Sequence, residues 1–155
     1  MRLDSSSGRP VEVEVFLLRV EAGGLAYRRC AGFLGEFEEP DGAARRVGQV
    51  RRVGVLHSTS WRCGADGRVV LTYVVLPDPE PWREAVGVGD AGLACGGSAD
   101  RPSPVKVEFA QVVVHAARHL AFLVEHDPHV GDAVRRDAAL ASVLASYAPG
   151  LAGRC

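Results

Sequence analysis

The sequence VVLTYVVL at positions 69–76 is the clearest indication of how this chain folds. The segment is rich in β-branched residues and has no charged side chain, a composition typical of a strand that is buried on both faces. We therefore expect residues 69–76 to form a central strand of a sheet, and we expect segments elsewhere in the chain to supply its neighbours.

Three segments earlier in the chain also have strand character. Residues 11–20 alternate valine with glutamate before both faces become apolar, which is the two-residue period of a strand entering a core. Residues 27–37 and 47–61 are less regular. Asp66-Gly67 separates the last of these segments from residues 69–76. It predicts a two-residue hairpin turn, because glycine accepts the positive φ of a type I′ turn.

The second half of the chain has helical character. Ser103-Pro104 is typical of a helix start, and residues 105–126 then follow without proline or glycine. Asp127-Pro128 ends this helix, since the residue before a proline is disfavoured in the helical conformation. A second helix begins at Pro128 or near Asp132 and continues until Pro149-Gly150 interrupts it.

These patterns predict an α+β fold. Its antiparallel sheet of about four strands lies in the N-terminal half and is covered on one face by a C-terminal antiparallel helix pair. With 155 residues, 47% of them hydrophobic, and a net charge of −1, the chain has the composition of a single domain over residues 1–155. Residues 77–104 are rich in proline and glycine, and we expect them to form a mobile loop.

Charge and hydropathy also limit the partners that we expect. Acidic and basic residues nearly balance along the chain, so there is no basic field of the kind that attracts nucleic acid. No apolar run is as long as a membrane span, and no apolar signal region follows the first residues. We therefore expect neither a nucleic acid nor a membrane as partner, and we expect a cytoplasmic location.

Polar residues interrupt the strand that precedes residues 69–76. In the register of the Asp66-Gly67 turn, Trp61 pairs with Thr72 and His57 with Leu76. These polar residues either lie on an edge strand that faces water or form the floor of a pocket, with Trp61 as its aromatic wall. Alternation predicts two faces, one with His57, Thr59 and Trp61 and the other with Ser58, Ser60 and Arg62. The candidate ligand-binding residues are Ser58, Thr59, Ser60, Trp61 and Arg62, with Arg62 suited to a small anionic ligand.

Two histidines on the expected long helix are the other candidates for chemistry. His115 and His119 are four residues apart, so both side chains lie on one face of a helix and can approach the same atom. With His57 they form the set of candidate catalytic residues. Alanine follows His115 where zinc proteases carry their general base, and a third metal ligand would have to come from His57 or a loop. We therefore assign no metal and no cofactor.

Two hypotheses for function remain open. The first is a non-catalytic binding or self-assembly domain, a homodimer formed through an apolar helix face or an open sheet edge. The alternative is a small-molecule-binding protein or a hydrolase-like enzyme with a histidine-lined cleft between the sheet and the long helix. The first hypothesis predicts that His57 and the helix histidines do not converge, and that an extended contact buries helix residues between two chains. The second predicts that His57 lies within reach of His115 or His119 around a concave pocket.

Overall fold

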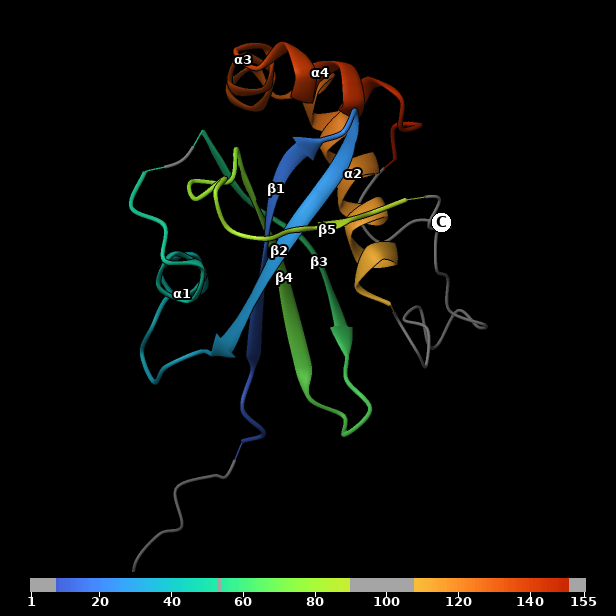
Figure 1. The fold of residues 1–155 in the computed structure, drawn as a ribbon. Coiled ribbons are helices and arrows are strands. Elements are labelled where there is room, and N and C mark those ends of the chain that lie inside the picture. Colours follow the sequence, from blue (N-terminus) through green and yellow to red (C-terminus); the bar gives the residue numbers. More distant parts are fainter. Residues whose placement is uncertain (1–7, 53, 90–107, 151–155) are drawn as a thin grey trace, which may run out of the picture.

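The structure is a computed structural model that describes residues 8–52, 54–89 and 108–150. Strands and helices alternate irregularly along the chain, with most strands in the first half (Figure 1). In chain order the elements are β1 (Glu12–Glu21), β2 (Gly24–Phe33), α1 (Pro40–Gly48), β3 (Val55–Cys63), β4 (Val69–Leu76), β5 (Val86–Gly87), α2 (Phe109–His126), α3 (Pro128–Arg135) and α4 (Ala138–Ala145).

The sheet has five strands in the order β3-β4-β1-β2-β5. The α+β class is confirmed, and so is the central position of β4, which lies between β3 and β1. The expectation of about four antiparallel strands is wrong. β1 pairs with β4 in parallel, while the other three pairs are antiparallel. The parallel pair arises because α1 lies in the connection between β2 and β3, and this longer connection lets the second hairpin join beside β1.

Helices cover both faces of the sheet, so the expectation of a single covered face is also wrong (Figure 1). On one face α1 packs on β1 and β2, and fully buried Ala43 and Ala44 belong to a cluster with Val13 and Val15. We call this the α1 face. The sequence indicated no helix here, and the predicted strand segment 47–61 overlaps the last two residues of α1. Pro40 in the first helical turn, followed by Asp41, is the local signal for this helix.

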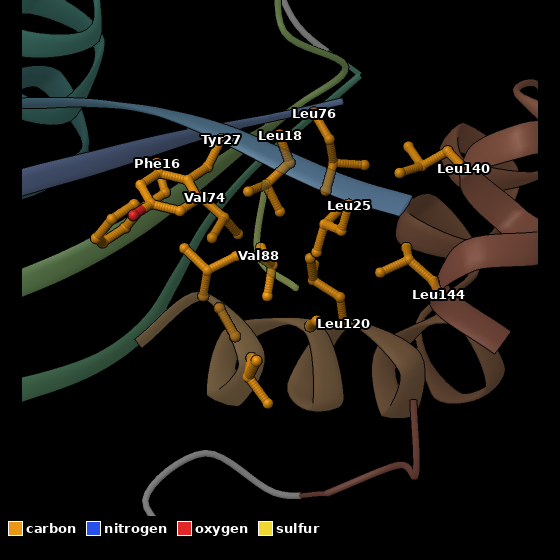
Figure 2. Close-up of a cluster of buried hydrophobic side chains, with 14 of the residues drawn as sticks. Phe16, Leu18, Leu25, Tyr27, Val74, Leu76, Val88, Leu120, Leu140 and Leu144 are labelled. Carbon is orange, nitrogen blue, oxygen red and sulfur yellow. The ribbon is translucent and has the colours of Figure 1, made fainter. Parts of the chain in front are cut away.

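The larger core lies on the opposite face, beneath α2, α3 and α4, and we call this the α2 face. Figure 2 shows side chains of the sheet, among them Phe16 and Val74, pointing toward Leu120 of α2. Leu140 and Leu144 of α4 close the same cluster at one end. All five of these side chains are almost fully buried. Complete burial of a side chain of this size stabilises the fold by roughly 1.5–3 kcal/mol relative to exposure.

The long helix ends as predicted but begins later than expected. Its last residue is His126, and the Asp127 carboxylate then accepts a hydrogen bond from the backbone N–H of His129 at 2.9 Å, which caps α3. The described helix begins at Phe109, and Ser103-Pro104 lies outside the described residues. The second predicted helix is divided, because Asp137 caps α4 as a separate helix. Three helices, α2, α3 and α4, therefore take the place of the predicted helix pair.

The connection between β3 and β4 differs from the predicted two-residue turn. The N–H of Gly64 donates to the carbonyl of Arg68 at 2.7 Å, which leaves three residues between them. Gly67 has a φ of 76°, so this glycine does adopt the left-handed conformation that the sequence indicated. The longer loop changes which residues of β3 and β4 face each other.

The first part of the predicted loop, residues 77–89, is tied to β1 and β2. The N–H of Asp78 donates to the carbonyl of Leu18 at 2.8 Å, and β5 pairs with β2. Residues 90–104, the rest of the predicted loop, lie outside the described residues. In the part of the chain that the structure describes, no helix is both long enough and apolar enough to cross a membrane.

Candidate functional site

A β-bulge in β3 determines where the polar residues of this strand point. Ser58 faces Tyr73 and Ser60 faces Thr72, so Thr59 is an extra residue that has no partner of its own in β4. Thr59 is buried, and its Oγ1 donates to the carbonyl of Thr72 at 3.5 Å. Because side chains alternate along a strand, one extra residue exchanges the faces for every residue beyond it.

The predicted grouping of these side chains is therefore wrong. His57 pairs with Val74 and Arg62 with Val70, whereas Trp61 pairs with Leu71. Val74 belongs to the core under α2, and Leu71 packs against the cluster under α1. Residues that are directly opposite in a sheet share a face. The α2 face thus carries His57, Ser60 and Arg62, and the α1 face carries Ser58 and Trp61.

The structure brings His57 beside His119 of α2. The centres of the two imidazole rings are 5.4 Å apart, and their planes are inclined by 32°. The ring of Phe122 is nearly parallel to that of His119, with ring centres 6.5 Å apart. Nδ1 of His119 is buried and, among the described residues, has no hydrogen-bond partner. The cleft hypothesis predicts this convergence, and the opposite expectation of the self-assembly hypothesis, that these histidines do not converge, is wrong. A catalytic role for these residues stays a prediction.

Both helix histidines are held in their neutral forms. Burial is the main cause that lowers the pKa of His119, with smaller contributions from His57 and His115, while a backbone hydrogen bond with Gly150 opposes the shift. Burial and the charge of Arg118 lower the pKa of His115. A neutral imidazole can accept a proton or bind a metal, whereas an imidazolium can do neither.

Arg62, the predicted anion-binding residue, is occupied by the protein itself. Its Nη2 donates to Oε2 of Glu14 at 2.9 Å, its Nη1 also donates to Glu14, and Thr72 donates to the same carboxylate at 2.7 Å. Arg29 adds a further hydrogen bond at 3.0 Å. Glu14 is fully buried, so this arrangement supplies the partners that a buried charge requires. Arg62 is therefore a structural residue in this fold.

The sequence analysis did not identify Glu14 as a member of this site. Burial by itself raises the pKa of Glu14, but the hydrogen bond and charge of Arg62 outweigh it, with help from Thr72 and Arg29, and the pKa is lowered. The available signal was the position of Glu14 on the same strand face as Phe16 and Leu18, which are core residues. A carboxylate in such a row needs cationic partners.

A second buried carboxylate, Asp78, holds the start of the β4–β5 connection. Arg19 donates to its Oδ2 at 2.9 Å and Arg28 to its Oδ1 at 2.6 Å, while the Asp78 side chain is completely buried. Burial raises the pKa of Asp78, but hydrogen bonds from Arg28, the backbone of Glu80 and Arg19 outweigh this effect and lower it. The sequence analysis did not identify this cluster either.

An apolar patch lies on the α1 face beside the bulge. It consists of Trp61 and Cys63 of β3 and their partners Val69 and Leu71 of β4, and we call it the Trp61 patch. Trp61 is 58% exposed. Cys63 is also exposed, whereas Val69 and Leu71 are half-buried. α1 packs mainly on β1 and β2, and it reaches β4 at Tyr73, whose hydroxyl donates to Asp41 at 2.8 Å.

A cavity of about 460 Å³ lies elsewhere, between the β1–β2 turn and α4. Gly23-Gly24, Val88 and Tyr147 are among the residues that line it, and none of the predicted site residues does. Its lining contains hydroxyl groups but no charged side chain. The predicted residues and this cavity are therefore separate features of the molecule.

No family model matches this chain, and no curated protein matches it.

Proposed function

We propose that this chain is a non-catalytic binding and self-assembly domain in which two copies join through the open edge of β3. The observation that carries the proposal is the position of β3 at the end of the sheet, with Trp61 exposed on it. Among the described residues, β4 is the strand neighbour of β3 on one side, and no strand lies on the other.

An open sheet edge is itself a binding surface. Each strand at an edge presents unpaired backbone N–H and C=O groups, which pair readily with another extended chain. At nine residues, β3 is much longer than β5, the two-residue strand at the opposite edge. The polar side chains of β3 are compatible with this exposure, because both the free strand and the paired strand leave them partly solvated.

The bulge limits which part of β3 can pair. A bulge interrupts the regular spacing of backbone groups and protects an edge from indiscriminate pairing. It leaves a regular segment, Ser60–Cys63, on one side of Thr59. That segment carries Trp61, and an exposed tryptophan is a frequent centre of binding energy in protein interfaces. Pairing through Ser60–Cys63 would bury Trp61 together with its neighbour Leu71.

A second copy of the chain is the occupant that these features favour. Two identical strands that pair in antiparallel orientation form a two-fold symmetric contact, in which each Trp61 patch meets the other. The net charge of −1 produces little repulsion between copies. The paired sheets would also bring the two Trp61 patches side by side on the α1 face, where each Trp61 side chain can pack against the strand of the other copy.

The mass of the particle in solution tests this proposal. We expect the native chain to be dimeric in size-exclusion chromatography with light scattering, and to dissociate on dilution. Trp61→Arg would place a charge at the centre of the contact, and we expect this variant to be monomeric. Trp82→Arg is the matched control, since Trp82 is 76% exposed in the β4–β5 connection, away from β3. A native chain that is monomeric at every concentration contradicts the proposal.

The proximity of His57 and His119 favours a second candidate function, the binding of a small molecule between β3 and α2. A ligand there would contact both imidazoles, which are 5.4 Å apart. Nuclear magnetic resonance of the imidazole groups during titration with a library of small molecules tests this function. We expect the imidazole chemical shifts of His57 and His119 to change together. Chemical-shift changes confined to His126 and His129 would contradict this second function.

A further inference from the structure

His57 and His119 come from different elements and meet at the boundary between β3 and α2. They are 62 positions apart in the sequence, and the contact exists because the bulge leaves His57 on the α2 face. The ring of Phe122 lies nearly parallel to that of His119. Neither the proposed assembly nor the buried ion pairs make use of these two imidazoles.

The separation of the rings is that of two ligands on one metal ion. Two imidazoles bound to a tetrahedral zinc through nitrogens roughly 2.0–2.1 Å from the ion have ring centres about 5 Å apart. The observed separation is 5.4 Å. The contact differs from the stacked pair Phe122 and His126, whose centres are 4.0 Å apart with planes inclined by 14°. The planes of His57 and His119 are inclined by 32° instead.

The unpartnered nitrogen of His119 is an independent observation. Buried polar atoms almost always have a hydrogen-bond partner, and an atom without one needs an explanation. Nδ1 of His119 is such an atom among the described residues.

We propose that His57 and His119 bind one divalent transition-metal ion, such as Ni²⁺, Cu²⁺ or Zn²⁺, with water in the remaining coordination positions. Imidazole suits these borderline ions and is a poor ligand for Mg²⁺ and Ca²⁺, which prefer oxygen. The lowered pKa of His119 keeps this ring neutral near pH 7, and only the neutral form can bind a metal.

The number of protein ligands defines the kind of metal site. In the described part of the chain, no group of three or more His, Cys, Asp or Glu residues is placed to hold one metal ion. A structural zinc site has four protein ligands and a catalytic one has three. Two ligands therefore give an exchangeable ion with open positions. Such an ion would connect the edge strand β3 to α2, and this inference does not depend on self-assembly.

The direct test is calorimetry of the full, untagged chain with reduced thiols, using Ni²⁺ as the probe and Mg²⁺ as the hard-ion comparison. We expect the native chain to bind one Ni²⁺ ion. We expect His57→Gln and His119→Gln each to abolish this binding. His126→Gln and Cys63→Ser should retain it, because they change another exposed imidazole and an exposed thiol that could bind the ion adventitiously. Mg²⁺ should give no binding heat.

A second measurement guards against variants that fail to fold. Imidazole nitrogen shifts of the native chain during titration with diamagnetic Zn²⁺ identify the ligands without any substitution. We expect the largest shifts at one nitrogen of His57 and at Nδ1 of His119. The proposal is overturned if the native chain binds no Ni²⁺. It is also overturned if binding survives in both His57→Gln and His119→Gln, or if the Zn²⁺ shifts occur at His126 or His129 instead.

Discussion

Arg62 at the edge of the sheet donates to the buried carboxylate of Glu14 in β1, with 2.9 Å between Nη2 and Oε2. The hydrogen bond passes over β4, where Thr72 donates to the same carboxylate. This contact ties the open edge strand to the middle of the sheet. It also means that the segment beyond the bulge is held in place by charge as well as by backbone hydrogen bonds.

Loss of either partner should destabilise the fold, but to different extents. Arg62→Met leaves Glu14 with Arg29 and Thr72, and we expect a loss of roughly 1–3 kcal/mol, the range for a hydrogen bond to a charged group. Glu14→Gln leaves two arginines facing a neutral amide, and we expect a larger loss, about 3 kcal/mol or more. Urea unfolding followed by circular dichroism measures both. Arg46→Met removes an exposed ion pair with Glu38 and is the control, which should change little.

The stability that Glu14 contributes should depend on pH. Its pKa is lowered in the folded protein, so the unfolded chain binds the proton more readily and stability is lost as the pH falls. The contribution is complete well above 4.5, the ordinary pKa of the group, and disappears as the pH falls through the folded value. The difference in stability between the native chain and Glu14→Gln should therefore shrink below about pH 4.5. A difference that stays constant down to pH 3 would count against a charged Glu14.

His119 should make the fold less stable in mild acid. Burial lowers its pKa, so below the ordinary value of 6.5 the unfolded chain takes up a proton that the folded chain resists. His57, His115 and Arg118 add positive charge nearby when the histidines are protonated. We expect the unfolding free energy to fall between pH 7.5 and 5.5, and to fall less in His119→Gln. Identical pH profiles for the two proteins would contradict this expectation. The unfolding free energy changes in this pH range because histidine is the side chain whose ordinary pKa lies there.

Asp78 should control the mobility of the β4–β5 connection. Its carboxylate is held by Arg19 and Arg28, and its backbone N–H donates to the carbonyl of Leu18 in β1. Asp78→Ala leaves both arginines without this partner, and we expect faster backbone hydrogen exchange over residues 78–89. Arg83→Ala removes only a partly exposed contact with Glu80 and should leave the exchange rate of that segment nearly unchanged. Equal rates in native protein and Asp78→Ala would show that backbone pairing alone holds the segment.

Local sequence signals predicted the elements whose causes are local. The apolar run of β4 indicated a central strand, and Asp127-Pro128 marked the end of α2, because each depends on adjacent residues. The parallel pairing of β1 with β4 depends on residues far apart in the chain. Helix α1 was missed because residues 40–48 contain proline, glycine and many polar residues, and its stability comes from Ala43 and Ala44 packing on the sheet.

One residue, Thr59, decided how far the candidate site could be predicted from the sequence. The sequence identified His57 and His119, and the structure places them together. The extra residue Thr59 in the bulge reversed the face of every side chain beyond it, which moved Trp61 to the α1 face. Glu14 was missed for a different reason, since its arginine partner in β3 is 48 positions away. Alternating patterns show which residues share a face but not which strands are neighbours.

Association of two copies through the edge of β3 is tested most directly by amide hydrogen exchange at two protein concentrations. The account predicts that amides of Ser60–Cys63 exchange more slowly in concentrated than in dilute protein, because the second copy occupies their free backbone groups. Amides of α1 and of the connection around Trp82 should exchange at the same rate in both samples. Rates in β3 that do not depend on concentration, or protection confined to another element, would contradict the account.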